Sequence, residues 1–117
     1  MLKAICNEIK ALESRGFTEV ELLALVSDTS YEVVFYAKHN NQYMQSNALV
    51  ENDVISSTEV DSIYKKVAEF VRQSKEFNPD KMNIVKASSD TVKIKYDEKR
   101  CRLYKIKKNW ITEIGVL

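Results

Sequence analysis

The stretch Tyr31-Glu32-Val33-Val34-Phe35-Tyr36-Ala37 decides the fold, because β-branched and aromatic residues dominate it and these favour a strand. The polar residues Asp28-Thr29-Ser30 immediately before it are typical of a tight turn. We therefore expect residues 17–27 to form a second strand that pairs with the first in an antiparallel hairpin.

Residues 17–27 also allow another structure. As a strand they place Glu19 and Glu21 on one face at its start, and they place four apolar side chains on the other face: Val20, Leu22, Ala24 and Val26. The alternative is a short helix through Leu22–Val26, opened by a capping box at Thr18 and Glu21. We favour the strand, because the turn then joins two strands.

Two further segments extend the sheet. Asn40-Asn41 tolerates the positive φ angles of a hairpin turn, so residues 42–49 should return as a third, more polar strand near an edge. Met82–Ala87 and Thr91–Tyr96 flank the polar turn Ser88-Ser89-Asp90. Lysines alternate with apolar residues in the later strand, which predicts one wet and one dry face.

Helical periodicity marks the rest of the chain. Apolar residues recur at helical spacing over residues 2–15 and 57–77. The later helix follows a capping box at Ser56–Glu59, and Pro79 prevents its continuation. Residues 101–115 fit a helix ending at Gly115, or a hairpin turning at Lys107-Lys108-Asn109.

These elements predict one α+β domain over residues 1–117. We expect an antiparallel sheet of about five strands in two hairpin units, with the helices packed on its dry face. The N-terminal and long central helices are the two expected there, and a C-terminal helix is possible.

Composition excludes several classes of protein. No apolar run approaches the roughly 18–20 residues of a membrane span, and the N-terminus turns polar too early for a signal peptide. We therefore expect a cytoplasmic protein that binds no membrane, with Cys6 and Cys101 as reduced thiols. The chain has 2 glycines, too few for a phosphate-binding glycine-rich loop.

The sequence indicates no enzyme, cofactor or metal site. His39 is the single histidine and lies beside the predicted hairpin turn at Asn40-Asn41. With two distant cysteines it does not provide the four ligands of a structural zinc site. Cys6 belongs to the apolar face of the first helix, where a thiol is not available as a nucleophile.

Charge is distributed unevenly along the chain. Residues 1–80 hold 13 acidic and 8 basic side chains, whereas residues 81–110 hold 3 acidic and 10 basic ones. This asymmetry predicts a binding protein with two chemically different surfaces.

The acidic surface is the first candidate site. A negative surface can occupy the cationic substrate groove of a nuclease, with fast, electrostatically steered association. The candidate partner-binding residues are Glu19, Glu21, Asp28, Glu32, Glu51, Asp53, Glu59 and Asp61.

The basic C-terminal third is the alternative site. Basic residues interleaved with Tyr96, Tyr104 and Trp110 can follow a phosphate backbone and stack bases. The candidate nucleic-acid-binding residues are Lys93, Lys95, Lys99, Arg100, Arg102, Lys105, Lys107 and Lys108.

Two segments carry a resemblance to a known family. Val26–Ala37 resembles the first hairpin of small bacterial immunity proteins, and Lys81–Tyr96 with the turn Ser88-Ser89-Asp90 resembles their second hairpin. These are antitoxin-like partners of polymorphic toxins, including those of contact-dependent growth inhibition systems. A helix separates the two hairpins in such proteins, and a segment containing tryptophan often closes the fold, as Trp110–Gly115 would here.

The resemblance implies a non-enzymatic inhibitor that forms a one-to-one complex with one cognate toxin domain. Nucleases are common among such toxins. The family has no shared catalytic or binding motif, so the resemblance assigns no individual residue to the contact.

Overall fold

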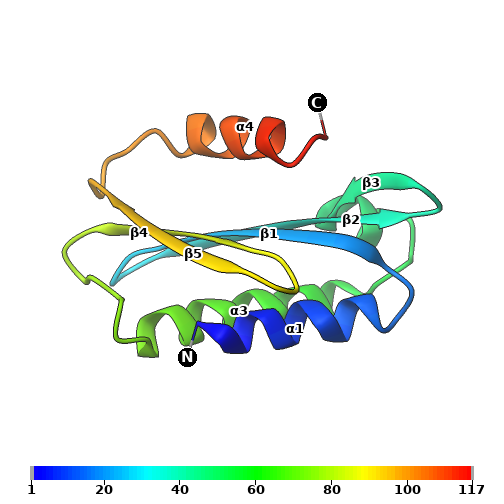
Figure 1. Cartoon of the computed structure of the whole chain (residues 1–117), viewed down its shortest axis with the longest axis horizontal. Helices are drawn as coiled ribbons and strands as arrows, with labels where there is room; N and C mark the ends of the chain where they lie inside the picture. Colours follow the sequence, from blue (N-terminus) through cyan, green and yellow to red (C-terminus); the bar gives the residue numbers. More distant parts are fainter. Residues whose placement is uncertain (1, 117) are drawn as a thin grey trace.

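The computed structural model describes residues 2–116 and contains one five-stranded antiparallel sheet in the order β3-β2-β1-β4-β5 (Figure 1). Neighbouring strands are joined by short turns, except where β1 pairs with β4. The strands are β1 (Thr18–Val26), β2 (Tyr31–His39), β3 (Gln42–Gln45), β4 (Met82–Ala87) and β5 (Val92–Asp97).

Helices cover both faces of this sheet (Figure 1). The helices α1 (Lys3–Glu13) and α3 (Ser57–Gln73) lie on one face, and α4 (Leu103–Glu113) lies on the opposite face. The short helix α2 (Ser46–Glu51) packs against β2, β3 and α3. No helix within residues 2–116 is long and apolar enough to cross a membrane.

The central strand β1 is buried on both faces. Leu22, Ala24 and Val26 belong to the core beneath α1 and α3. Leu23 and Leu25 belong to a second core, which Trp110 of α4 closes with an exposed fraction of only 1%. The sheet therefore supports two separate apolar layers.

The predicted α+β fold is confirmed. The strand expected over residues 17–27 is β1, and its Glu19 has a φ angle of +50°, at an irregularity in the pairing with β2. The C-terminal segment is the helix α4 rather than a hairpin, and it ends near Gly115. Both cysteines are free thiols, and Cys6 is buried in α1 as expected.

Two boundaries differ from the predictions. The third strand ends at Gln45, and residues 46–51 are helical because Leu49 is buried in the core and the hydroxyls of Ser46 and Tyr64 form a hydrogen bond. The long helix ends at Gln73, not at residue 77, and Phe77 packs on the core from the following loop.

The position of α4 was not predicted, because the possible C-terminal helix was assigned to neither face. It covers the face opposite α1 and α3 (Figure 1), because Leu23, Leu25 and Val34 make that face apolar in its centre. The lysines of β5 remain exposed beside it: Lys93 and Lys95 are exposed, whereas Val92 and Ile94 are half-buried.

Candidate functional site: an acidic end and a lysine hollow

The candidate acidic residues fall into two groups. Glu19, Glu21, Glu51, Asp53, Glu59 and Asp61 come from the end of the molecule where α1 ends and β1 and α3 begin (Figure 1). We call these six residues the acidic end. Asp28 and Glu32 lie on the turn between β1 and β2 and at the start of β2, at the opposite end of the hairpin.

Glu19 is held in place by two neighbours. Its carboxylate lies 2.7 Å from Lys38 Nζ and accepts a hydrogen bond of 3.0 Å from the hydroxyl of Tyr43. The bond with Lys38 lowers the pKa of Glu19. Partial burial, followed by the hydrogen bond to Glu19, raises the pKa of Tyr43 to about 12.

Glu21 shows that negative charge accumulates here. Burial raises the pKa of Glu21, and the charges of Glu13 and Glu19 raise it further. Like charges disfavour ionisation of one another only when they are close. Glu13 therefore belongs to this surface, although its position in α1 did not single it out in the sequence.

The remaining members of the acidic end differ in their ion pairing. Glu59 forms an ion pair with Arg15 across the α1–α3 junction. Glu51, Asp53 and Asp61 are exposed, and within residues 2–116 none of them has a basic group at ion-pair distance. These three carboxylates are available to a partner.

The two predicted charge sets meet at the other end of the hairpin. Asp28 Oδ1 lies 2.8 Å from Lys99 Nζ, and Glu32 Oε1 lies 2.6 Å from Lys107 Nζ. The bond with Lys99 lowers the pKa of Asp28. Folding thus neutralises two members of each set, which removes them from any simple acidic or basic surface.

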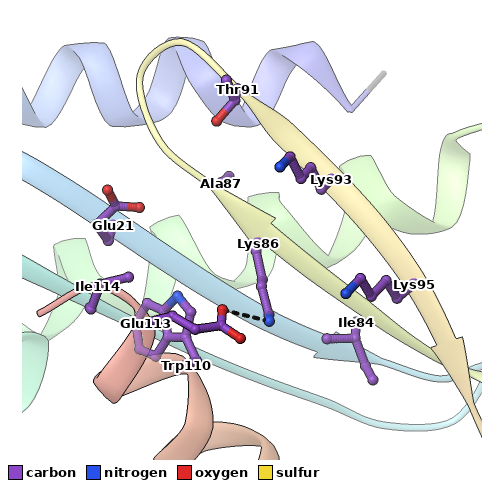
Figure 2. Close-up of a pocket in the computed structure, with 10 residues that line it drawn as sticks. All are labelled: Glu21, Ile84, Lys86, Ala87, Thr91, Lys93, Lys95, Trp110, Glu113 and Ile114. Atoms are coloured by element: carbon purple, nitrogen blue, oxygen red, sulfur yellow. Dashed lines mark hydrogen bonds and ion pairs between the residues drawn. The ribbon is translucent and has the colours of Figure 1, made fainter.

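The other basic candidates form two groups. Lys93 and Lys95 line a hollow of about 430 Å³ between β4, β5 and the end of α4 (Figure 2). We call this site the lysine hollow; it also contains Lys86, which the sequence analysis did not select. Its other lining residues are Glu21, Ile84, Ala87, Thr91, Trp110, Glu113 and Ile114.

The second basic group lies around the start and outer side of α4. Tyr104, in the first turn of α4, has a side chain that is 68% exposed. The exposed members of this group are Arg100, Arg102, Lys105 and Lys108.

His39, which was considered as a catalytic residue, lies against an aromatic side chain. His39 packs against Phe17, with ring centroids 5.9 Å apart. Within residues 2–116, no three His, Cys, Asp or Glu side chains lie close enough together to hold a metal ion.

In comparisons with known proteins, the chain matches no protein-family model and no curated protein sequence.

Proposed function

We propose that this chain is an immunity protein that binds a nuclease toxin domain and blocks its active site. The observation that carries the proposal is the acidic end, the end of the molecule from which six of the eight candidate carboxylates come (Figure 1). The resemblance of the two hairpins to immunity proteins supports a toxin domain as the partner, but it does not imply the activity of that toxin.

Charge complementarity provides the physical basis. A nuclease binds a polyanion, so its substrate groove must be positively charged, and a folded acidic surface competes for the same groove. Complementary charges raise the rate of association and select the partner, and salt screens this effect. The complex is expected to form quickly at low salt and more slowly as ionic strength rises.

The carboxylates without ion pairs should dominate the contact. Glu51, Asp53 and Asp61 are exposed to solvent, whereas Glu19 and Glu59 already form ion pairs with Lys38 and Arg15. Breaking those internal pairs would offset part of the gain from binding.

The test needs a candidate toxin domain, and the first one to try is the C-terminal domain of any large secreted protein encoded immediately upstream of this chain. The variant Glu51→Gln, Asp53→Asn, Asp61→Asn removes three charges from the acidic end, and asparagine tolerates the positive φ of +57° at position 53. Its association rate should fall by about tenfold or more at low salt.

A matched control removes three exposed carboxylates from the opposite end of the sheet, in Glu76→Gln, Asp80→Asn, Glu98→Gln. This variant should stay within about twofold of the unmodified chain. Equal slowing of both variants would mean that net charge, and not the acidic end, drives association. Absence of a complex, together with no protection of cells that produce the toxin domain, would reject the immunity function.

A second candidate function is nucleic-acid binding through the outer side of α4. Exposed Tyr104 with Lys105 and Lys108 beside it combines a stacking surface with phosphate-binding cations. Titration with RNA and DNA at two salt concentrations tests it. Binding that weakens steeply with salt would favour this function, and absence of binding at low salt would remove it.

A further inference from the structure

The lysine hollow lies where α4 ends above the β4–β5 hairpin (Figure 2). Trp110 and Ile84 form apolar parts of its lining, while Lys86, Lys93 and Lys95 supply ammonium groups. The side chains of Lys93 and Lys95 turn from β5 toward the hollow (Figure 2). The site is therefore a hollow of defined volume that is lined by apolar side chains and by three lysines.

The pairing register of β4 and β5 places these lysines next to one another. Lys86 of β4 is directly opposite Lys93 of β5, and Lys95 lies on the same side of the strand two residues later. Like charges directly opposite each other destabilise a sheet, and residues two apart on a strand are only about 7 Å apart. The arrangement has a cost that a bound anion would relieve.

Glu113 already demonstrates how an anion is held here. Its Oε2 atom lies 2.8 Å from Lys86 Nζ. This bond lowers the pKa of Glu113, and the charges of Lys95 and Lys93 lower it further from a greater distance. One internal carboxylate therefore occupies the Lys86 side of the hollow.

Lys93 and Lys95 remain without an acidic partner. Within residues 2–116 neither has a carboxylate at ion-pair distance. Glu21 lines the hollow from β1, so its charge opposes an anion at that side. The position next to β5, between Lys93 and Lys95, is the most favourable one for an anion.

We propose that the lysine hollow binds the phosphate group of a small phosphorylated ligand between Lys93 and Lys95. A phosphate monoester carries a charge of about −1.5 to −2 at neutral pH, which matches two ammonium groups and accepts several charge-assisted hydrogen bonds. A carboxylate would neutralise only one of them. Glu21 is the one member of the acidic end that also lines this hollow, and the three carboxylates expected to dominate the toxin contact do not line it.

The experiment follows binding of inorganic phosphate and of phenyl phosphate, against chloride at equal ionic strength. Trp110 is the only tryptophan of the chain and lines the hollow, so its fluorescence reports occupancy. NMR shifts of the lysine side chains provide a second measurement. Both should show saturable binding.

The variant Lys93→Gln, Lys95→Gln should bind about tenfold more weakly, and Glu113→Gln should bind more tightly because Lys86 becomes available.

The matched control is Lys105→Gln, Lys108→Gln, which removes the same charge outside the hollow and should change affinity less than about twofold. Equal weakening by both double variants would overturn the proposal, as would the absence of saturable change in both measurements. A short single-stranded DNA without terminal phosphates distinguishes the source of the phosphate. If it binds more tightly than phenyl phosphate and depends on Lys105 and Lys108, the ligand is nucleic acid on the outer side of α4 and the proposal is wrong.

Discussion

Lys107 of α4 holds Glu32 of β2, with Nζ 2.6 Å from Oε1. The pair joins the C-terminal helix to a strand that lies 75 residues earlier in the chain. Together with the pair between Lys86 and Glu113, it orients α4 across the sheet. Trp110, between these two pairs in sequence, provides the apolar contact.

The ion pair should contribute little energy by itself. Both side chains are partly exposed, at 32% and 43%, so solvent screens their attraction. Replacing Glu32 by Gln should lower the free energy of unfolding by at most about 1 kcal/mol. Urea unfolding of the two single variants and the double variant Glu32→Gln, Lys107→Gln measures the coupling. A coupling above this value that persists in high salt would contradict the expectation.

Trp110 should account for most of the stability of the second core. It is 1% exposed and packs edge-on against Tyr36, with ring centroids 5.6 Å apart. Trp110→Ala removes this contact and leaves a cavity, so the free energy of unfolding should fall by about 3–5 kcal/mol.

The control for this substitution is Tyr104→Ala on the exposed side of the same helix. It should change stability by no more than about 0.5 kcal/mol. Chemical denaturation followed by circular dichroism compares the two. Similar losses would indicate that α4 is stabilised by its helical propensity and not by packing of its tryptophan.

Glu113 should make stability depend on acid pH. Its pKa is below the ordinary value of 4.5, chiefly through the hydrogen bond from Lys86. A carboxylate with a lowered folded pKa stabilises the fold above its unfolded pKa, and this contribution disappears as pH falls through the folded pKa. Glu113→Gln should therefore lower stability at neutral pH, by up to about 1 kcal/mol for so exposed a pair, and have no effect in strong acid. NMR titration should also show the pKa of Glu113 rising in Lys86→Gln.

Glu21 should behave in the opposite way. Burial, with Glu13 and Glu19 nearby, raises its pKa, so the folded state binds the proton more tightly than the unfolded state. Its ionisation costs stability as pH rises above the unfolded pKa through the folded one. Glu21→Gln should stabilise the chain at neutral pH, and the gain should shrink on acidification. A loss of stability at neutral pH would show that the carboxylate makes a favourable contact.

Asn83 should be the most sensitive polar residue in the sheet. Its side chain is fully buried, and its Nδ2 group donates hydrogen bonds to the carbonyl oxygens of Val26, Asn78 and Lys81. Asn83→Ala leaves these buried acceptors without their donor and should cost about 3 kcal/mol.

The substitution Asn83→Asp provides a sharper comparison. A carboxylate there accepts but does not donate, and it would face three carbonyl oxygens in a buried site. The loss of stability at neutral pH should therefore equal or exceed that of Asn83→Ala. Thermal unfolding measures both variants, and a milder effect of aspartate would contradict this role of the amide donor.

The strands were predictable because their local patterns are strong. The β-branched residues of β2 and the turn at residues 28–30 identify the first hairpin before any tertiary contact is known. The continuous run Leu22–Val26 also indicates burial on both faces, and this signal could have placed a helix on the second face. The apolar spacing of α4 fits a hairpin almost as well, so only packing of Trp110 distinguishes the two.

The candidate sites were less predictable, because they depend on contacts between distant segments. Lys99 and Asp28 are 71 residues apart, and no sequence pattern indicates that they pair. Lys86 was missed for a different reason. It follows Met82 and Ile84 at alternate positions of β4, so a strict period of two would have placed it on the face of Lys93 and Lys95.

The edge position of β5 has a consequence for solutions of this protein at high concentration. An open sheet edge can recruit a strand from a second molecule and so begin aggregation. Two copies meeting along β5 would bring Lys93 and Lys95 of each toward the same charges of the other, whereas the opposite edge, β3, has only 4 residues. Charge repulsion along β5 and the short length of β3 should therefore prevent association of two molecules through their sheet edges.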